Sequence, residues 1–214
     1  MSYTLKEKIE DPRHPSHFSE DLLVWYNRFR EEIVPSLYHN PHDVHGISHI
    51  ERVLKLSFTL INYLGRDKLS HNDLLILGLS AVYHDIGRVN DDVDFEHGNQ
   101  AVVKLKELKL LEKFVSKYYL TEKFNEDNDN LLILHFIIAN HNVGDKYAQA
   151  ILNDSEINNK EHAWYLYCIL CDSDNLDRVR LGDLDIRFLR LIESLEMVDY
   201  AFYLLHNLEE ILQK

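Results

Sequence analysis

The chain contains very few residues that interrupt helices, with only 7 glycines and 4 prolines among 214 residues. Helix interiors disfavour both residue types, whereas short strands joined by tight turns need them often. The stretches between these few breaks are rich in Leu, Ile, Lys and Glu, which favour long helices over many short strands. The sequence therefore predicts an all-α fold.

Length and composition predict one soluble domain over residues 1–214, without repeats, low-complexity tracts or a linker. A net charge of −13 argues against general nucleic-acid binding and against binding to acidic membranes. The apolar stretches are too short to span a membrane, and the N-terminus has no apolar signal region, so a cytoplasmic protein is expected. Cys168 and Cys171 lie inside an apolar run and are predicted to be core residues. No oligomeric state is predicted.

Apolar residues recur every three to four positions in several segments, which is typical of amphipathic helices. Two polar stretches between them, 88–96 and 142–159, are expected to be connections near the mouth of a cleft. Five helices are predicted with both ends: from 20 to just before Pro35, 46–64, from 70 or 72 to 87, about 131–141 and about 197–212. Two more are predicted by their start alone, at about 97 and about 160.

Four of the predicted helices carry a side chain able to bind metal at the end of their apolar face: His49, the adjacent pair His84 and Asp85, His141, and Asp174. A single histidine on an apolar face is usually a hydrogen-bonded core residue. Several buried ionisable groups without partners, however, would cost much free energy. A shared divalent cation removes that cost, because imidazole nitrogen and carboxylate oxygen are its usual ligands. The pattern predicts a metal centre.

At these positions the chain resembles the HD-domain superfamily of metal-dependent phosphohydrolases, which has an H…HD…D pattern. The matching residues are His49 in HIERV, His84 and Asp85 in HDIGR, and Asp174 in SDNLD, and the resemblance covers about residues 40–190. It implies a helical bundle in which these four residues hold a divalent ion, whether Mn, Fe, Co, Ni, Zn or Mg. It also implies hydrolysis of a phosphate ester, commonly in a nucleotide.

The resemblance suggests further site residues. His97, in EHGNQA, and His141 fall where some family members hold a second metal ion, although members with one ion keep histidines there too. Asp85 and Arg88 are the expected catalytic residues, with Arg88 contacting phosphate. Three more residues are candidates for contacts behind the ligands or with substrate: His45, Arg52 and Arg178. No role is assigned to His39 or His42.

The function predicted is hydrolysis of a small phosphorylated substrate, a nucleotide or similar metabolite, by metal-activated water. Two alternatives stay open: a non-catalytic module that senses a nucleotide or metal, and a dinuclear-iron oxygenase of the same fold. The residues after the HD pair, Ile86, Gly87 and Arg88, differ from the acidic residues found there in alarmone hydrolases and 5′-nucleotidases of the superfamily. The particular substrate is therefore not predicted.

Overall fold

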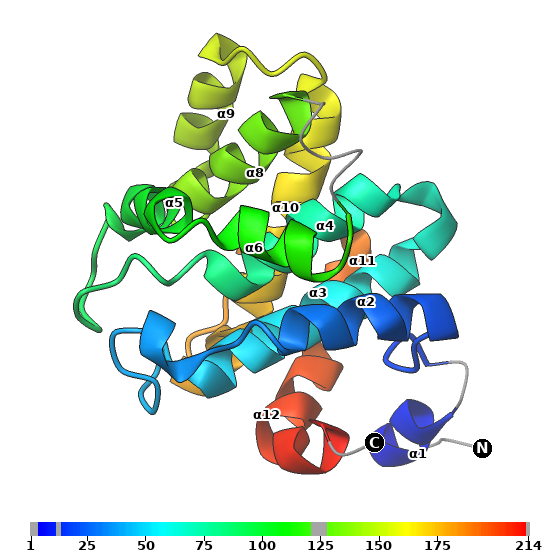
Figure 1. Ribbon diagram of the computed structural model, residues 1–214. Helices are drawn as coiled ribbons and strands as arrows, with labels where there is room; N and C mark the ends of the chain where they lie inside the picture. The colour runs from blue at the N-terminus through cyan, green and yellow to red at the C-terminus, as the bar shows by residue number, and fades with distance from the viewer. Residues whose placement is uncertain (1–3, 12–13, 121–127, 213–214) are drawn as a thin grey trace.

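A computed structural model describes residues 4–11, 14–120 and 128–212 of the chain. Within these ranges every regular element is a helix, so the predicted all-α class is confirmed (Figure 1). The α-helices are α1 (Leu5–Glu10), α2 (Glu20–Arg30), α3 (Ile47–Leu64), α4 (His71–Tyr83), α5 (His97–Glu107), α6 (Leu110–Lys117), α8 (Asn128–Asn140), α9 (Asp145–Asp154), α10 (Lys160–Leu176), α11 (Ile192–Glu196) and α12 (Val198–Leu212). Short 3₁₀ turns lie at Pro35–Leu37, Arg66–Lys68, Asp177–Leu181 and Ile186–Phe188.

The helix boundaries follow local signals in the sequence. Ser19 caps α2 by accepting a hydrogen bond from the backbone of Leu22, as predicted. Ser70 and Asp73 form a reciprocal capping box at the start of α4, which settles the choice between 70 and 72 as its beginning. Gly65 ends α3 with a φ of 97°, a conformation that favours glycine.

Helix α3 crosses the middle of the molecule and packs against α2, α4, α10 and α12 (Figure 1). Helix α8 packs against α4 and α5, so α4 links the two groups of helices. The core between them is apolar and aromatic, and the rings of Phe29 and Phe114 stack with centroids 4.8 Å apart. This packing brings one end of each of α3, α4, α5, α8 and α10 to a common region.

Two predicted boundaries differ from the structure. The connection expected at 142–159 contains α9, which buries Ala148 and Leu152 four residues apart. The apolar pattern of α9 did not stand out in the sequence, because the helix is only 10 residues long and is flanked by Asn, Gly and Ser. Helix α4 ends at Tyr83, and the chain turns before Gly87. The stretch 88–96 has no regular structure, as predicted, and much of the polar stretch 121–130 lies outside the described residues.

The remaining expectations concern the cysteines and membrane spans. Cys168 and Cys171 are buried in α10 and unbonded to each other, and burial raises the pKa of the Cys168 thiol to about 12. They are core residues, as predicted. Among the described helices, none has both the length and the apolar character needed to cross a membrane.

Candidate metal centre

The predicted ligands come together from five helices. His49 lies in the first turn of α3, His84 and Asp85 follow α4 directly, and Asp174 lies near the end of α10. The two further candidates join them: His97 is the first residue of α5, and His141 follows the last residue of α8. All are buried except Asp174, whose side chain is 27% exposed.

Two glycines allow α5 to approach the HD turn and α8 closely. A Cβ atom on Gly87 would lie 2.0 Å from the carbonyl oxygen of His97, and one on Gly98 would lie 2.6 Å from that of Ala139. Lys104 of α5 also donates a hydrogen bond to the carbonyl of Ile86, at 2.8 Å. These contacts explain the glycines of HDIGR and EHGNQA, because any side chain there would push His97 away from Asp85.

Four of the imidazole rings are oriented in the same way. In each ring Nδ1 lies within hydrogen-bonding distance of an oxygen that can only accept: His49 on Asp177 Oδ2 (2.7 Å), His84 on the carbonyl of Ala81 (3.0 Å), His97 on that of Asp94 (2.5 Å) and His141 on that of Ile138 (2.8 Å). Each Nδ1 must therefore carry a hydrogen, and each neutral ring has a free lone pair on Nε2. This is the orientation that histidine ligands of metals adopt.

The free Nε2 atoms face one another. His84 Nε2 lies 3.3 Å from His49 Nε2, and His97 Nε2 lies 2.9 Å from His141 Nε2. When the four rings are neutral, with hydrogen on Nδ1, neither pair can form a hydrogen bond, and the lone pairs oppose each other in a buried space. A cation between them would turn this repulsion into coordination. The residues therefore fit a divalent metal.

Asp85 divides its two oxygens between the two histidine pairs. Its Oδ2 lies 3.5 Å from His49 Nε2, and its Oδ1 lies 3.1 Å from His97 Nε2 and 3.7 Å from His141 Nε2. Asp174 Oδ1 lies 3.4 Å from His49 Nε2 and 4.0 Å from His84 Nε2. We call His49, His84 and Asp174 the first half of the centre, and His97 and His141 the second half; Asp85 is shared.

The charge state of the cluster suits a cation. Burial lowers the pKa of His84 to about 3, so this ring is neutral near pH 7. Burial acts to raise the pKa of Asp174, but the imidazoles of His84 and His49 outweigh it and bring the pKa to about 2. The pKa of Asp85 is held well below its usual range in the same way, against the effect of burial. Two carboxylates and the neutral imidazole of His84 are thus suited to metal binding, whereas, against the effect of burial, hydrogen bonds to Asp177 and Asp85 raise the pKa of His49.

Behind His49 lies an ion-pair network around Asp177. Besides accepting from His49, this carboxylate accepts hydrogen bonds from Arg52 Nε at 2.5 Å and from Arg180 Nη1 at 3.2 Å. Arg52 therefore lies behind the candidate ligand His49 and is hydrogen-bonded to Asp177. Asp177 was not among the predicted site residues, although its place one turn after Asp174, at the end of α10, was a usable signal.

The other basic candidates are divided between the centre and the surface. Arg88 donates from Nε to Asp85 Oδ1 at 3.0 Å. Arg180 reaches within 3.5 Å of His45 Nδ1, and His45 in turn lies 3.0 Å from Asp85 Oδ2. Arg178 instead forms an exposed ion pair with Asp183. Of the two neighbouring arginines, the one beside the centre is thus Arg180.

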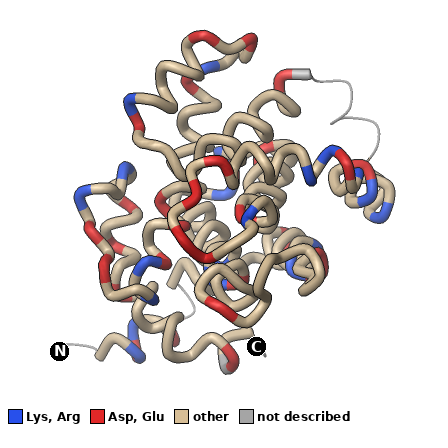
Figure 2. The backbone as a smooth tube through the Cα atoms, turned by 90° about the vertical axis from the view of Figure 1, so that its left-hand side faces the viewer, with Lys and Arg blue, Asp and Glu red and all other residues tan. Residues whose placement is uncertain are grey.

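The centre is most accessible past Asp174 and His45, since His45 is 16% exposed and the other histidines are nearly covered. Figure 2 shows acidic positions on loops of the face that lies to the left in Figure 1, and the sequence gives the 88–96 loop four acidic residues, Asp91, Asp92, Asp94 and Glu96. Arg88 is tied to this loop by a hydrogen bond from Nη1 to the carbonyl of Asp92. The loop therefore borders the site.

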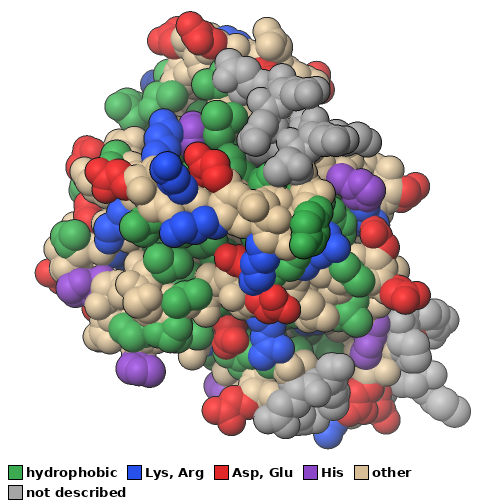
Figure 3. Space-filling model, in the orientation of Figure 1, with side chains coloured by type: hydrophobic (Ala, Val, Ile, Leu, Met, Phe, Trp, Pro, Cys, Tyr) green, Lys and Arg blue, Asp and Glu red, His purple; other side chains and the backbone are tan. Residues whose placement is uncertain are grey.

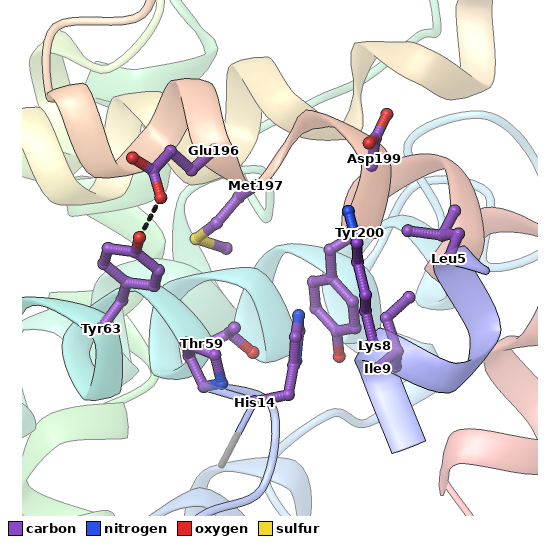
Figure 4. A pocket seen from close by; sticks show the side chains of 11 residues that line it. Leu5, Lys8, Ile9, His14, Thr59, Tyr63, Glu196, Met197, Asp199 and Tyr200 are labelled. Carbon is purple, nitrogen blue, oxygen red and sulfur yellow. Dashed lines mark hydrogen bonds between the residues drawn. The ribbon is translucent and has the colours of Figure 1, made fainter. Parts of the chain in front are cut away.

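A separate cavity of about 210 Å³ lies between α1, α3 and the start of α12 (Figure 4). His14, Thr59, Met197 and Tyr200 line it, and Tyr63 donates a hydrogen bond to Glu196 at its edge. None of the candidate ligands contributes to its walls. It is not part of the metal centre.

The fold and the site define the class: an all-helical domain with buried histidine and aspartate groups that can hold a metal ion. The chain belongs to the HD-CE family, whose model matches residues 17–193 and so includes every candidate ligand. The family name marks an HD-like domain, in agreement with the resemblance in the sequence. Comparisons with curated proteins and with solved structures return no match.

Proposed function

We propose that the protein is a divalent-metal-dependent phosphohydrolase that acts on a small phosphorylated molecule such as a nucleotide. The observation that carries the proposal is the opposition of four histidine Nε2 lone pairs around Asp85 in a buried cluster. Buried groups in this arrangement gain stability from a cation and are costly without one. The HD-like family of the chain supports the same function.

We further propose two metal positions that share Asp85. The first half of the centre would hold one ion with Asp85 Oδ2, and the second half would hold another with Asp85 Oδ1. The Nε2 contacts of His97 and His141 with Oδ1, at 3.1 and 3.7 Å, support the second position. A carboxylate whose two oxygens face separate histidine pairs is a suitable bridge between two ions.

Bound divalent ions supply Lewis acidity, which lowers the pKa of a water ligand and polarises a phosphoryl oxygen. The chain contributes the rest. Arg88 and Arg180 present guanidinium groups beside Asp85 and His45, where they can neutralise charge on phosphate oxygens. Asp177 keeps the proton of His49 on Nδ1 and leaves Nε2 as the ligand atom. His45, the most exposed histidine of the cluster, is placed to contact substrate.

One observation also favours a second candidate, a dinuclear-iron oxygenase. The second half of the centre is assembled in the structure, and an oxygenase of this fold would use both halves to hold iron. Metal identity separates the two functions. Two irons per chain, with oxygen-dependent turnover and no phosphate release, would favour the oxygenase.

The test combines elemental analysis of the protein as isolated with a screen of nucleotides and phosphomonoesters in the presence of Mn²⁺. We expect phosphate release, its loss in His84→Ala, and full activity in His206→Ala, a matched change at an exposed histidine on α12. Full activity of His84→Ala would contradict the metal assignment. A nucleotide that binds without turnover under every metal tested would instead favour the sensor module.

A further inference from the structure

A groove of about 750 Å³ lies beside the metal centre, between α5, α8 and α9. Figure 3 shows hydrophobic side chains among charged ones at the upper left of the molecule, in the region where Figure 1 places these helices. Its lining includes Phe95, which precedes α5, Val103 of α5, Phe136 of α8, and Tyr147 and Ile151 of α9. The size suits a small molecule, since ligand pockets are commonly about 300–1,000 Å³.

The side chains that line the groove favour an uncharged ligand over an anionic one. Among the residues that line it, Glu96 alone carries a charged side chain, and no Lys or Arg is present. A phosphate group would find no cation among these lining residues and would lie near the Glu96 carboxylate, although Lys106 of α5 acts electrostatically on His135 from outside the lining. The groove is therefore unlike the metal centre, where Arg88 and Arg180 favour an anion, and it suits a different compound.

The walls combine flat apolar faces with a few polar groups. Phe95 and Tyr147 are 70% and 64% exposed, so their rings are available for stacking. His135 also lines the groove, and its Nε2 is buried without a hydrogen-bond partner among the described residues. Burial lowers the pKa of His135 to about 4, so the ring is neutral near pH 7. Asn99 adds an amide at the rim.

From this chemistry we infer that the groove is a binding site for an uncharged planar heteroaromatic molecule of the nucleoside type. Such a ring can stack on the exposed aromatics and has donors and acceptors along its edge for His135 and Asn99. An acyl chain would leave these polar groups without partners. An anionic nucleotide would bring charge that the groove does not neutralise.

The site is connected to the second half of the metal centre through the backbone. Glu96 lines the groove and immediately precedes His97; Asn140 also lines it and immediately precedes His141. A molecule that contacts both α5 and α8 in the groove therefore bears on the spacing of the two helix ends that carry these ligands. Binding in the groove and metal binding in the second half must then be linked, and the linkage is reciprocal.

The experiment is a calorimetric titration of the full chain with adenosine, with AMP as the charged counterpart, with and without Mn²⁺. We expect adenosine to bind more tightly than AMP in the absence of Mn²⁺. Val103→Trp, which fills the groove from a position 44% exposed, should weaken adenosine binding at least about tenfold. Tyr147→Ala is a second variant, for the case in which Val103→Trp disturbs the fold. It should weaken adenosine binding about threefold or more, because a stacking ring is lost.

Phe188→Ala is the matched control, because Phe188 is also 64% exposed and does not line the groove; it should bind adenosine as the wild type does. The Mn²⁺ affinity of the second half should change about fivefold or more with saturating adenosine. No adenosine binding, or equal binding by wild type and both groove variants, would overturn the site. Loss of adenosine binding in His84→Ala alone would place the molecule in the metal centre, and it would also overturn the site. Because the readout is binding, a failure of the proposed hydrolysis leaves the result interpretable.

Discussion

The two halves of the candidate metal centre are held in different ways. In the first half, the ring of His49 is oriented by a side chain, the carboxylate of Asp177, which Arg52 and Arg180 hold in turn. In the second half, the rings of His97 and His141 are both oriented by backbone carbonyls. The first half thus depends partly on replaceable side chains, and the second depends on where two helices end.

This difference has consequences for how each half can be altered. A carboxylate behind a histidine raises the basicity of the ligand and can be exchanged without moving the backbone. A carbonyl cannot be exchanged, so the second half responds only to changes in helix packing, above all at Gly87 and Gly98. Mutations should therefore separate the halves, except at Asp85, which both share.

The largest effect is expected from Asp85→Asn, which keeps the shape of the side chain but removes the shared charge. The carboxylate offers one oxygen to each half, whereas the amide group cannot act as a ligand in both halves. We expect metal content to fall from two ions to none and phosphate release to become undetectable, as measured by elemental analysis and a phosphate assay. If Asp85→Asn kept one tightly bound ion, Asp85 would belong to one half only.

The next effect is a selective loss of the second half in Gly98→Ala. The added Cβ would lie 2.6 Å from the carbonyl oxygen of Ala139, so α5 must move and carry His97 away from Asp85. We expect metal content to drop from two ions to one, and a cost in folding stability of about 1–3 kcal/mol from overpacking. Thermal unfolding and elemental analysis measure the two effects.

Gly144→Ala is the matched control for this change. A Cβ atom at Gly144 would meet nothing within 4 Å, and its φ of −67° is available to any residue. Both ions and the stability of the wild type should be retained. If Gly98→Ala also retained both ions, the second half would not depend on the close approach of α5.

Asp177→Asn is expected to have a smaller effect than Gly98→Ala and to affect the first half of the centre instead of the second. The amide keeps the shape of the side chain but weakens the hydrogen bond that orients His49, and losses of this kind typically weaken metal affinity about 10–100-fold. The first half should lose affinity while the second half is unchanged, as measured by competition with a metal chelator. Asp183→Asn, at a carboxylate that pairs with Arg178 on the surface, is the control and should bind both ions normally.

Much of the fold and the convergence of the candidate ligands could be predicted from the sequence. Helix periodicity put His49, His141 and Asp174 on inward faces, and the HD pair followed an apolar segment, so convergence at one point was a sound expectation. Periodicity gives the face of a helix but not the distance between helices. For that reason the division of the two Asp85 oxygens and the close approach at Gly87 and Gly98 could not be foreseen.

The sequence was least informative where structure is irregular. Arg178 and Arg180 lie in a 3₁₀ turn, where helical periodicity no longer tells which side chain points inward. The structure shows that Arg180 donates a hydrogen bond to Asp177 and that Arg178 pairs with Asp183. Helix α9 was missed for a related reason, because ten residues carry too few apolar repeats to stand out between polar flanks.

Arg180→Gln and Arg178→Gln test this assignment directly. Loss of a charged hydrogen-bonding group beside the site should lower kcat/KM about tenfold in Arg180→Gln, which corresponds to the usual strength of such bonds. Arg178→Gln should behave as the wild type, because an exposed ion pair contributes little. Steady-state kinetics with the phosphoester that the wild type hydrolyses fastest measures kcat/KM for both variants. A larger loss in Arg178→Gln would show that the 3₁₀ turn rearranges when substrate binds.

The smallest effect is expected at the far ends of the two helices that carry His84 and Asp174. There His162 of α10 pairs with Asp73 of α4 at 2.7 Å, and this hydrogen bond raises the pKa of His162 above 6.5. The pair therefore stabilises the fold fully below about pH 6.5, and its contribution is lost as pH rises through the folded-state pKa. His162→Gln should lower the free energy of unfolding by less than about 1 kcal/mol at about pH 5.5 and not at all at about pH 9. Urea unfolding at both pH values measures the free energy of unfolding. An unchanged metal content in the variant would show that the first half depends on Asp177 rather than on the distant pairing of α4 and α10.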